Sequence, residues 1–469
     1  MPISDDLLND SEALLVEIYS AFEPFQPPPK DAYVNCEEVR GGWDIIRELG
    51  KKITLSKNPT CQLYSGHRGV GKSTELGRLK VYLESKKYKV VSFAVDEEDI
   101  EPQDAEYADI LFACTRKLVE DVKLEKDRNP LVQWIAKRWT AWKDFAQTDV
   151  EFDGLTIEQQ VSAFRKLSAT FKAVPDKRRQ MRQNINAETP SLVEALNEFI
   201  QNAKEDLAAD YPRGLVVIVD NLDRIAETQA DKGAPSNYDE IFINRSEMLR
   251  GLACHVIYTA PISMIYSERA TQLEDRFDTP DVLPMITVRT RENQVNPAGL
   301  RKLKELITRR VQTVHPKLVQ TLEGSVDGVD IPAVFDSPKS VEDLCIMSGG
   351  HVRNLVQLVQ KAIEWTDELP ISERAVRRAI ADARATYLKT IQESQWTLLV
   401  TAYKKRDYKR DPDHLRLLLN RCLLEYRDYD EIVGTSETWC NIHPLIEAIP
   451  QFQAALKALE AAQNGQSSN

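Results

Sequence analysis

A stretch of eight residues, Gly66-His67-Arg68-Gly69-Val70-Gly71-Lys72-Ser73, places the strongest constraint on what this chain can fold into. It matches the pattern GxxxxGK[ST], in which glycines let backbone N–H groups curve around a phosphate without Cβ clashes. The stretch follows a short apolar run, CQLYSG, and precedes a segment of helix-forming composition, KSTELGRLKVYLES. A strand, a glycine-rich loop and a helix in that order are the context that the pattern requires.

Most positions of this loop have an expected task. Lys72 would reach the β- and γ-phosphates of a nucleotide, and the hydroxyl of Ser73 would ligate Mg²⁺. The N-terminus of the following helix adds partial positive charge. We therefore expect ATP and Mg²⁺ as the bound groups, with a chance match to the pattern as the alternative. The residues expected to contact the nucleotide here are Gly66, His67, Arg68, Gly69, Val70, Gly71, Lys72, Ser73 and Thr74.

Apolar runs further along the chain predict more strands. The most hydrophobic of them, GLVVIVD at 214–220, ends on Asp220. A carboxylate at the tip of a buried strand suits the second half of a magnesium site, whereas its ordinary structural role is to start a turn. We expect Asp220 to hold Mg²⁺ together with Ser73. The other predicted strands are KVVSFAVD at 89–96, CHVIYTAP at 254–261 and VLPMITV at 282–288. The last is expected at the edge of the sheet, because Pro284 cannot donate a hydrogen bond to a neighbouring strand.

Much of the remaining sequence predicts helices. Residues 100–212 contain no strong strand run, are punctuated by prolines such as Pro190, and carry an aromatic stripe at 134–145 that is typical of a packing face. The run LLEYRDYD to ETWCNI predicts a β-hairpin. The expected divisions are an N-terminal arm and helix at 1–60, a core at 61–290 with a helical insert at 100–212, a helical lid at 291–390, a winged-helix-like module at 391–460 and a flexible tail at 461–469.

Composition excludes several classes of protein. Lys plus Arg number 61 and Asp plus Glu 73, so the net charge of −12 argues against a chain that coats nucleic acid along its whole surface. No run of about 18 uncharged apolar residues predicts a membrane span. The acidic N-terminus lacks the features of a secretory signal. Seven scattered cysteines without CxxC spacing indicate reduced thiols and a cytoplasmic location, and the six histidines form no ligand-spaced pair, so we expect no metal beyond Mg²⁺.

The phosphate loop, the strand ending on Asp220 and an extra strand between these motifs resemble the AAA+ and STAND classes of P-loop ATPases. The run VVIVDNLDR also resembles the KAP ATPases of bacterial conflict systems, and the whole resemblance covers roughly 61–95 and 214–390. It implies an α/β P-loop NTPase fold with a parallel sheet, a long helical insert and a helical lid. The C-terminal winged-helix-like module is similar to that of origin-recognition ATPases.

One position departs from the AAA+ pattern. AAA+ ATPases usually carry a glutamate directly after the aspartate that ends the strand, whereas this chain has Asn221. An amide cannot accept a proton from water as a carboxylate does. Asp223 is the expected substitute, and we expect slow hydrolysis, as suits a switch better than a motor.

The resemblance implies further site positions, most with a structural alternative. Thr259 would orient the γ-phosphate or cap a turn. Arg276, in EDRFDTP, would be a trans-acting arginine finger or a surface ion pair. Arg353, in SGGHVRNLVQLVQKAI, would face the γ-phosphate from the start of a lid helix. Tyr33 and Val34 would line an adenine pocket or belong to the core.

The C-terminal module carries a local excess of positive charge between 404 and 421. Its second helix is expected to begin at Asp411 or Asp413 as N-cap. Contact with DNA phosphates is one interpretation of the basic face, and a solvated face or a docking face for an acidic partner is the other. The run DKRRQMR at 176–182 has a similar nucleic-acid interpretation, with a solvated charge run as the alternative. The basic residues of the face are Lys404, Lys405, Arg406, Lys409, Arg410, Arg416 and Arg421.

Three functions are compatible with these features. The first is an ATP-binding, slowly hydrolysing switch that controls its own nucleotide-dependent assembly or a separately encoded effector or regulatory protein, in the setting of a bacterial defence system. The second is a DNA-binding AAA+ ATPase of the origin-recognition or transposition-regulator kind. The third is a nonhydrolytic scaffold stabilised by ATP, which the asparagine at 221 suggests.

Overall fold

The structure, a computed structural model, describes residues 11–122, 124, 129–142, 156–229, 233–320, 331–332, 334–430 and 433–466. These residues form two compact units. The first, here called the sheet unit, comprises Ile45–Ser65 and Glu75–Val282. The second, the helical unit, comprises Met1–Asp44, Gly66–Thr74 and Leu283–Asn469, and therefore includes the phosphate loop.

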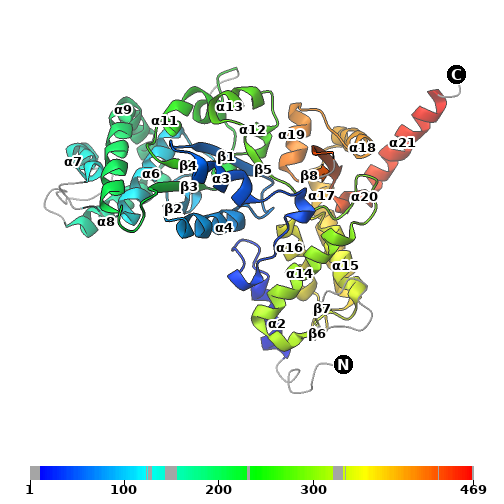
Figure 1. The fold of residues 1–469 in the computed structure, drawn as a ribbon. Coiled ribbons are helices and arrows are strands. Elements are labelled where there is room, and N and C mark those ends of the chain that lie inside the picture. Colours follow the sequence, from blue (N-terminus) through cyan, green and yellow to red (C-terminus); the bar gives the residue numbers. More distant parts are fainter. Residues whose placement is uncertain are drawn as a thin grey trace. The chain divides into compact units, whose positions relative to one another are not determined.

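The sheet unit is built on a five-stranded sheet of order β2-β3-β4-β1-β5 (Figure 1). Neighbours β2 and β3, β3 and β4, and β4 and β1 run parallel, which confirms the predicted α/β class. The run 282–288 is a strand only as far as Leu283, because Pro284 cannot donate to a ladder. The strands are β1 (Cys61–Gly66), β2 (Lys89–Ala94), β3 (Leu215–Asp220), β4 (His255–Thr259) and β5 (Asp281–Leu283).

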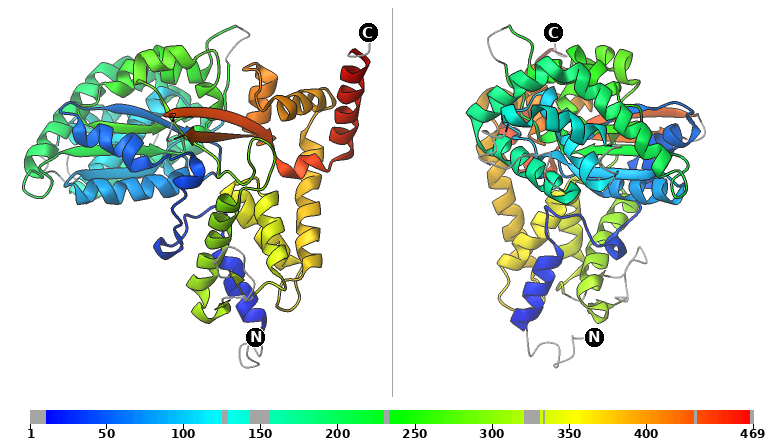
Figure 2. Two further views of the ribbon diagram at one scale, coloured as in Figure 1. Left: turned by 45° about the vertical axis from the view of Figure 1, so that its right-hand side comes forward. Right: turned by 90° about the vertical axis from the view of Figure 1, so that its left-hand side faces the viewer.

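The predicted helical insert is present. Figures 1 and 2 show its four long helices, α6 to α9, together on one side of the sheet. Pro190, expected to interrupt this region, lies inside the 32-residue helix α9. The helices of the sheet unit are η3 (Ile46–Gly50), α3 (Lys51–Leu55), α4 (Lys72–Ser85, which begins in the helical unit), α5 (Val95–Glu98), α6 (Tyr107–Asp121), α7 (Pro130–Trp142), α8 (Ile157–Ala173), α9 (Pro175–Asp206), η6 (Leu222–Arg224), α10 (Asn237–Asp239), η7 (Glu240–Asn244), α11 (Ser246–Arg250), α12 (Ile262–Ile265) and α13 (Ala270–Phe277).

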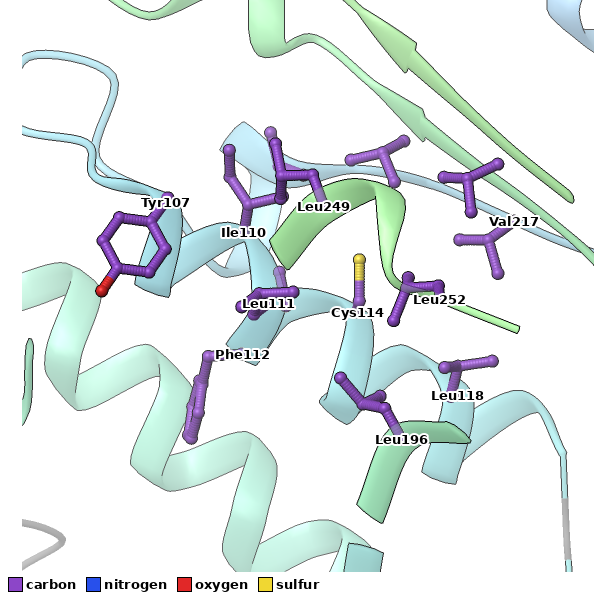
Figure 3. Close-up of a cluster of buried hydrophobic side chains, with 14 of the residues drawn as sticks. Tyr107, Ile110, Leu111, Phe112, Cys114, Leu118, Leu196, Val217, Leu249 and Leu252 are labelled. Atoms are coloured by element: carbon purple, nitrogen blue, oxygen red, sulfur yellow. The ribbon is translucent and has the colours of Figure 1, made fainter. Parts of the chain in front are cut away.

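The core of this unit lies where α6 meets the sheet and α9. Leu111 and Leu118 of α6 point toward Leu196 of α9 and Val217 of β3 (Figure 3). Each such side chain, fully buried, contributes about 1.5–3 kcal/mol relative to exposure. In the predicted aromatic stripe Trp134 and Trp139 are buried, as a packing face requires, whereas Phe145 and the side chain of Trp142 lie outside the described part.

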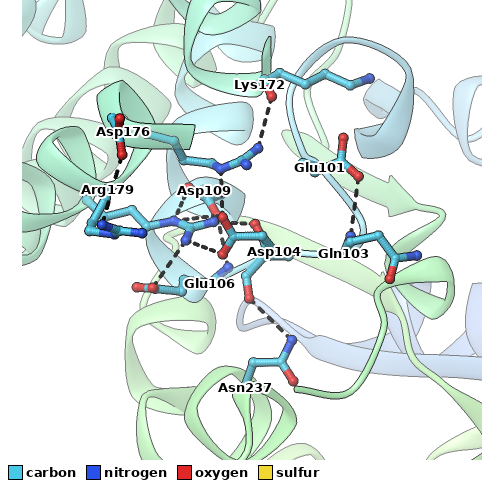
Figure 4. A network of polar contacts seen from close by, with 12 residues as sticks. Glu101, Gln103, Asp104, Glu106, Asp109, Lys172, Asp176, Arg179 and Asn237 are labelled. Atoms are coloured by element: carbon cyan, nitrogen blue, oxygen red, sulfur yellow. Dashed lines mark hydrogen bonds and ion pairs between the residues drawn. The ribbon is translucent and has the colours of Figure 1, made fainter. Parts of the chain in front are cut away.

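The basic run at 176–182 has an internal role that the nucleic-acid interpretation missed. Arg178 and Arg182 are both buried on α9 and bind carboxylates that precede and begin α6. Figure 4 shows two of these carboxylates, Asp104 and Asp109, within a network of polar contacts. Arg182 Nη1 lies 2.6 Å from Asp104 Oδ1, and Arg182 Nη2 lies 2.6 Å from Asp109 Oδ2. Arg178 Nε donates to Asp104 Oδ2 over 2.9 Å. These two arginines therefore fasten α9 to α6 and are not available to a phosphate backbone.

The helical unit contains the predicted C-terminal helices and hairpin. Asp411 is the N-cap of α19 and accepts the N–H of His414 over 3.0 Å, which settles the choice between two expected caps. Helix α21 runs past residue 461, where a tail was expected. No helix in the described ranges is long and apolar enough to cross a bilayer. The elements are α2 (Ser11–Ala21), η1 (Lys30–Ala32), η2 (Glu38–Arg40), α14 (Pro297–Val314), η8 (Pro316–Leu318), β6 (Val319–Gln320), β7 (Ile331–Pro332), α15 (Pro338–Met347), α16 (Val352–Glu364), α17 (Glu373–Thr390), η9 (Glu393–Gln395), α18 (Trp396–Lys405), α19 (Pro412–Leu419), β8 (Leu423–Asp430), β9 (Thr435–Ile442), α20 (Pro444–Glu447) and α21 (Pro450–Gln466).

Candidate functional site

The loop that follows β1 has backbone geometry that its glycines make possible. Gly66, Gly69 and Gly71 have φ values of 145°, 90° and 113°, which side-chain-bearing residues rarely adopt. Gly69 also has no room for a side chain, since a Cβ there would lie 2.7 Å from the Cβ of Arg353 and 2.7 Å from Cε1 of His351. Helix α4 begins at Lys72, directly after the third glycine.

The side chain of Lys72 turns back over this loop. It is 6% exposed, and its Nζ donates to the carbonyl oxygens of Gly66 (2.9 Å) and His67 (3.1 Å). The ammonium group is thus held against the loop by two backbone carbonyls. Ser73, one residue further on, is exposed at the first turn of α4.

The start of α16 is bonded to the same loop. Gly349 and Gly350, with φ of 63° and 77°, make the turn before it. His351 Nδ1 accepts the N–H of Asn354 (3.0 Å), so Nε2 carries the proton and donates to the carbonyl of Arg68 (2.7 Å). The N–H of Arg353 donates to the carbonyl of Gly69 (3.0 Å).

Arg353 therefore lies at the loop through its backbone, while its guanidinium contacts the N-terminal segment. Nε donates to the carbonyl of Pro24 (3.1 Å), and the guanidinium carbon lies 5.4 Å from the centre of the Phe25 ring. Its role toward a γ-phosphate stays a prediction. Tyr33 and Val34 also lie in this N-terminal segment, with Val34 buried and the Tyr33 carbonyl accepting from Arg309, and their adenine-pocket role stays a prediction too.

His67, which the loop pattern leaves unspecified, connects the loop to the C-terminal hairpin. Its buried Nε2 accepts the N–H of Glu425 in β8 over 3.2 Å. Burial first, and then the charges of Lys72 and Arg421, lower the pKa of His67 from 6.5 to about 3. The unfolded chain therefore binds more protons than the folded one between these values, and the free energy of unfolding falls as pH drops from 6.5 toward 3.

The end of β3, in the sheet unit, carries the second group of predicted residues. Asp220 is buried, and its Oδ1 accepts the N–H of Asn221 over 2.7 Å. Thr259 Oγ1 accepts the N–H of Leu222 (2.9 Å) and donates to the carbonyl of Val219 (3.4 Å). These are the bonds of a turn cap, and a phosphate-orienting role for Thr259 stays a prediction. Asp223 is buried in the η6 turn that follows.

Asn221 faces a carboxylate that the sequence analysis missed. Asp96 lies just beyond β2, whose Ala94 pairs with Asp220. Asn221, at φ 67°, donates from Nδ2 to Asp96 Oδ1 (2.7 Å), and Arg224 Nη1 lies 2.6 Å from Asp96 Oδ2. The signal was available, because KVVSFAVD ends in an aspartate just as GLVVIVD does. A carboxylate absent from position 221 is thus present at the neighbouring strand end.

Arg276, the predicted arginine finger, is bonded within its own unit. Its Nε donates to the carbonyl of Ile243 (2.9 Å) and its Nη1 to the carbonyl of Gln272 (3.0 Å). These bonds hold α13 against η7. Any action in trans stays a prediction.

The pairing of Asn221 with Asp96 predicts a specific coupling. Asn221→Asp would set two carboxylates against each other, so we expect the free energy of unfolding to fall by about 1–3 kcal/mol. Asp96→Asn in the same chain should recover most of that loss, because an amide and a carboxylate again face each other. Denaturant unfolding of both single variants and the double variant measures this coupling. Glu97→Gln, at an exposed neighbouring carboxylate, is the control, and additive effects in the double variant would contradict the pairing.

Comparisons with known proteins add little to this geometry. No family model matches the sequence, and no curated protein sequence matches it significantly. The Aeropyrum pernix ORC1 protein in complex with DNA is similar at a TM-score of 0.38 and 13% identity, over 94% of this chain and 96% of that one. The Aeropyrum pernix ORC2 protein (TM-score 0.39, 11% identity, 96% and 98%) and Cdc6p from Pyrobaculum aerophilum (0.38, 11%, 94% and 98%) are similar to the same degree. Similarities this low do not assign the chain to a family.

Proposed function

We propose that this chain is an ATP-binding switch, in which Mg²⁺-ATP at the phosphate loop controls the lid helix α16 and the C-terminal hairpin. One observation carries the proposal: the loop is bonded directly to both. The carbonyls of Arg68 and Gly69 accept bonds from His351 and Arg353, and His67 accepts one from β8. A change in the conformation of the loop when ATP binds would therefore act directly on both α16 and β8.

The residues present suit a triphosphate. Three glycines at positive φ leave backbone amides able to line a concave surface, and a buried ammonium lies over it. On binding, Lys72 would exchange two carbonyl oxygens for phosphate oxygens. The Ser73 hydroxyl and the Asp220 carboxylate would hold Mg²⁺, which neutralises charge on the phosphate oxygens when it is bound.

Hydrolysis by this chain is expected to be slow. Position 221 offers an amide where a proton acceptor would be needed, and in the described structure both oxygens of the nearby Asp96 carboxylate are engaged, by Asn221 and Arg224. We expect a turnover far below about 10 per second, at the low end of ordinary enzyme rates. Tens of turnovers per second would overturn the switch interpretation in favour of a motor. An absence of phosphate release would favour the nonhydrolytic scaffold.

The deciding experiment is calorimetry with ATP and Mg²⁺, paired with measurement of the mass of the protein in solution with and without nucleotide. We expect saturable heat, and a change of mass or of protease sensitivity around α16 between the ATP and ADP states. No heat on titration with ATP would reject the proposal outright. Heat of binding without any difference between the ATP and ADP states would support nucleotide binding but reject the proposed switch.

The output of the switch is proposed from resemblance alone. VVIVDNLDR and the phosphate loop resemble ATPases of the STAND and KAP kinds, which implies control of assembly or of a separately encoded effector. A bacterial defence system is the corresponding setting. Co-purification of a defined partner in one nucleotide state but not the other tests this part of the proposal.

A second candidate, DNA binding, is favoured by exposed cations in the C-terminal module. Four of the seven predicted basic residues have internal contacts: Lys404 with Glu460, Arg406 with Asn441, Arg421 with Asn354, and Arg410 with the Tyr408 ring. Acidic residues are exposed along the hairpin, so a DNA contact would be confined to the surface around α18 and α19. Four of the exposed cations on this surface are Lys405, Lys409, Arg410 and Arg416.

Changing these four residues to alanine together should weaken duplex DNA binding and reduce its salt dependence. Each lost phosphate contact lowers the slope of log affinity against log salt by about 0.9. Fluorescence anisotropy at several salt concentrations measures the slope. Arg377→Ala with Arg378→Ala, two exposed cations on α17, is the control. Undetectable binding by the unaltered protein, or a slope unchanged in the fourfold variant, would reject this candidate.

A further inference from the structure

Arg40 is a buried arginine that lies against the phosphate loop. It is 4% exposed, and its Nη2 donates to the carbonyl of Val70 over 2.9 Å. A Cβ added to Gly71 would lie 3.7 Å from the same nitrogen, so the guanidinium runs along the Val70–Gly71 part of the loop. Lys72 follows directly. Two cationic groups therefore lie against the same loop, Arg40 at Val70 and the ammonium group of Lys72 at Gly66 and His67.

Most of the guanidinium has no partner. Its Nε and Nη1 are both buried and donate to no hydrogen-bond acceptor among the described residues, and within that part of the chain Arg40 forms no ion pair. A buried cation without a counter-charge is costly, by several kcal/mol even after relaxation. Buried arginine N–H groups are ordinarily hydrogen-bonded. The unsatisfied donors thus indicate that an anion belongs beside them.

The backbone holds Arg40 firmly in this place. It ends the η2 turn, and Gly41 follows at φ 63°. A Cβ on Gly41 would lie 2.5 Å from the carbonyl oxygen of Arg427 in β8, so the turn is pressed against the hairpin. On the other side the carbonyl of Val39 accepts the N–H of Thr287 over 2.8 Å. The donors are therefore fixed in position rather than carried on a mobile arm.

We propose that Arg40 is a phosphate-binding residue, whose guanidinium donates from Nη1 and from the second Nη2 hydrogen to phosphate oxygens of the nucleotide held by the loop. A guanidinium offers two parallel N–H groups to one phosphate, which an ammonium cannot do. The inference rests on the proposed function and deepens it, because it adds a second cation to Lys72 and assigns the ligand to the nucleoside polyphosphates. It also means that the η2 turn, which carries Arg40, would contact the phosphate chain directly.

The test is the affinity of Arg40 variants for ATP and for adenosine, measured by calorimetry. Arg40→Met removes the charge and donors at similar length, and we expect ATP affinity to fall about 10- to 100-fold, the loss typical of charge-assisted hydrogen bonds. Affinity for adenosine, which has no phosphate, should not change. Arg40→Lys should lie between Arg40→Met and the unaltered protein, because it keeps the charge and loses the paired N–H geometry.

Arg310 supplies a matched control. It is 5% exposed, donates from Nη1 to the carbonyl of Ala21 (2.7 Å) and lies by the Phe22 ring, and like Arg40 it has a buried Nε without a described partner. We expect Arg310→Met to change ATP affinity less than about 2-fold.

Stability without nucleotide separates a binding role from a structural one. Replacing an unpaired buried ion by a hydrophobic residue often leaves a protein equally or more stable, so Arg40→Met should not lower the unfolding temperature in the absence of ATP. The extra stability that ATP confers should shrink. ATP affinity of Arg40→Met and Arg40→Lys within about 2-fold of the unaltered protein would overturn the inference while leaving the proposed function intact. Failure of the unaltered protein to bind ATP would instead reject the proposed function.

Discussion

Lys72→Ala is expected to weaken ATP binding by more than about 100-fold and to abolish any phosphate release. The ammonium group is buried at the loop and engages two carbonyls that a phosphate would replace, so it acts where screening by water is weak. Charge-assisted hydrogen bonds contribute about 1.5–3 kcal/mol each, and the loss of two accounts for the expected fold-change. Calorimetry and a phosphate-release assay measure the two effects.

The control for this variant is Lys80→Ala, on the same helix. Lys80 is partly exposed and lies 4.0 Å from Glu84 in an i, i+4 pair that contributes little. We expect its affinity for ATP to match that of the unaltered protein. Equal affinities for all three proteins would show that the loop does not hold a triphosphate through Lys72. Thermal unfolding without nucleotide confirms that Lys72→Ala is folded.

Gly350→Ala is expected to lower the free energy of unfolding of the helical unit by about 3 kcal/mol or more. Gly350 has φ 77°, and a Cβ there would lie 1.8 Å from the carbonyl oxygen of Ile286. A left-handed conformation costs a non-glycine residue about 1–2 kcal/mol, and relieving the clash requires backbone movement that adds to it. Denaturant unfolding followed by circular dichroism measures the loss.

Gly434→Ala separates the two contributions. Gly434 has φ 70°, and a Cβ there would meet no atom within 4 Å. Its variant should lose only the conformational part, about 1 kcal/mol. Equal losses for Gly350→Ala and Gly434→Ala would mean that the turn before α16 moves freely. In that case α16 would not be held rigidly against the loop, and the switch would lose its connection.

Local patterns allowed the sheet strands and the loop to be predicted from sequence. Continuous apolar runs predicted β1 to β4, because buried parallel strands need apolar side chains on both faces. The glycine spacing predicted a tightly curved loop, and the positive φ values of Gly66, Gly69 and Gly71 agree with it, since no other residue adopts them as readily. The hydrogen-bonding preference of aspartate at a helix start predicted a cap at Asp411 or Asp413, and the structure shows it at Asp411.

Contacts between distant segments were beyond that reasoning. The aspartate that ends KVVSFAVD was visible in the sequence, but its pairing with Asn221 was not, because the pair forms only once β2 lies beside β3. The internal use of Arg182 likewise depends on α9 packing beside α6. His67 was treated as unrestricted by its motif, yet it accepts a bond from a residue 358 positions away. Such pairings depend on tertiary packing, which neither propensity nor periodicity reports.

The carbonyls of Arg68 and Gly69 accept hydrogen bonds from the ring of His351 and from the backbone N–H of Arg353. A trans peptide is planar, with its N–H directed opposite to its C=O, so anchoring a carbonyl also aims the amide of the next residue. These hydrogen bonds therefore fix the direction of the backbone N–H donors of the loop before a ligand binds. Much of the conformational entropy that ordering the loop would cost on binding is then already lost when the chain folds. Substitution of His351, which holds the carbonyl of Arg68 and has no proposed contact with a ligand, would accordingly weaken binding at the loop.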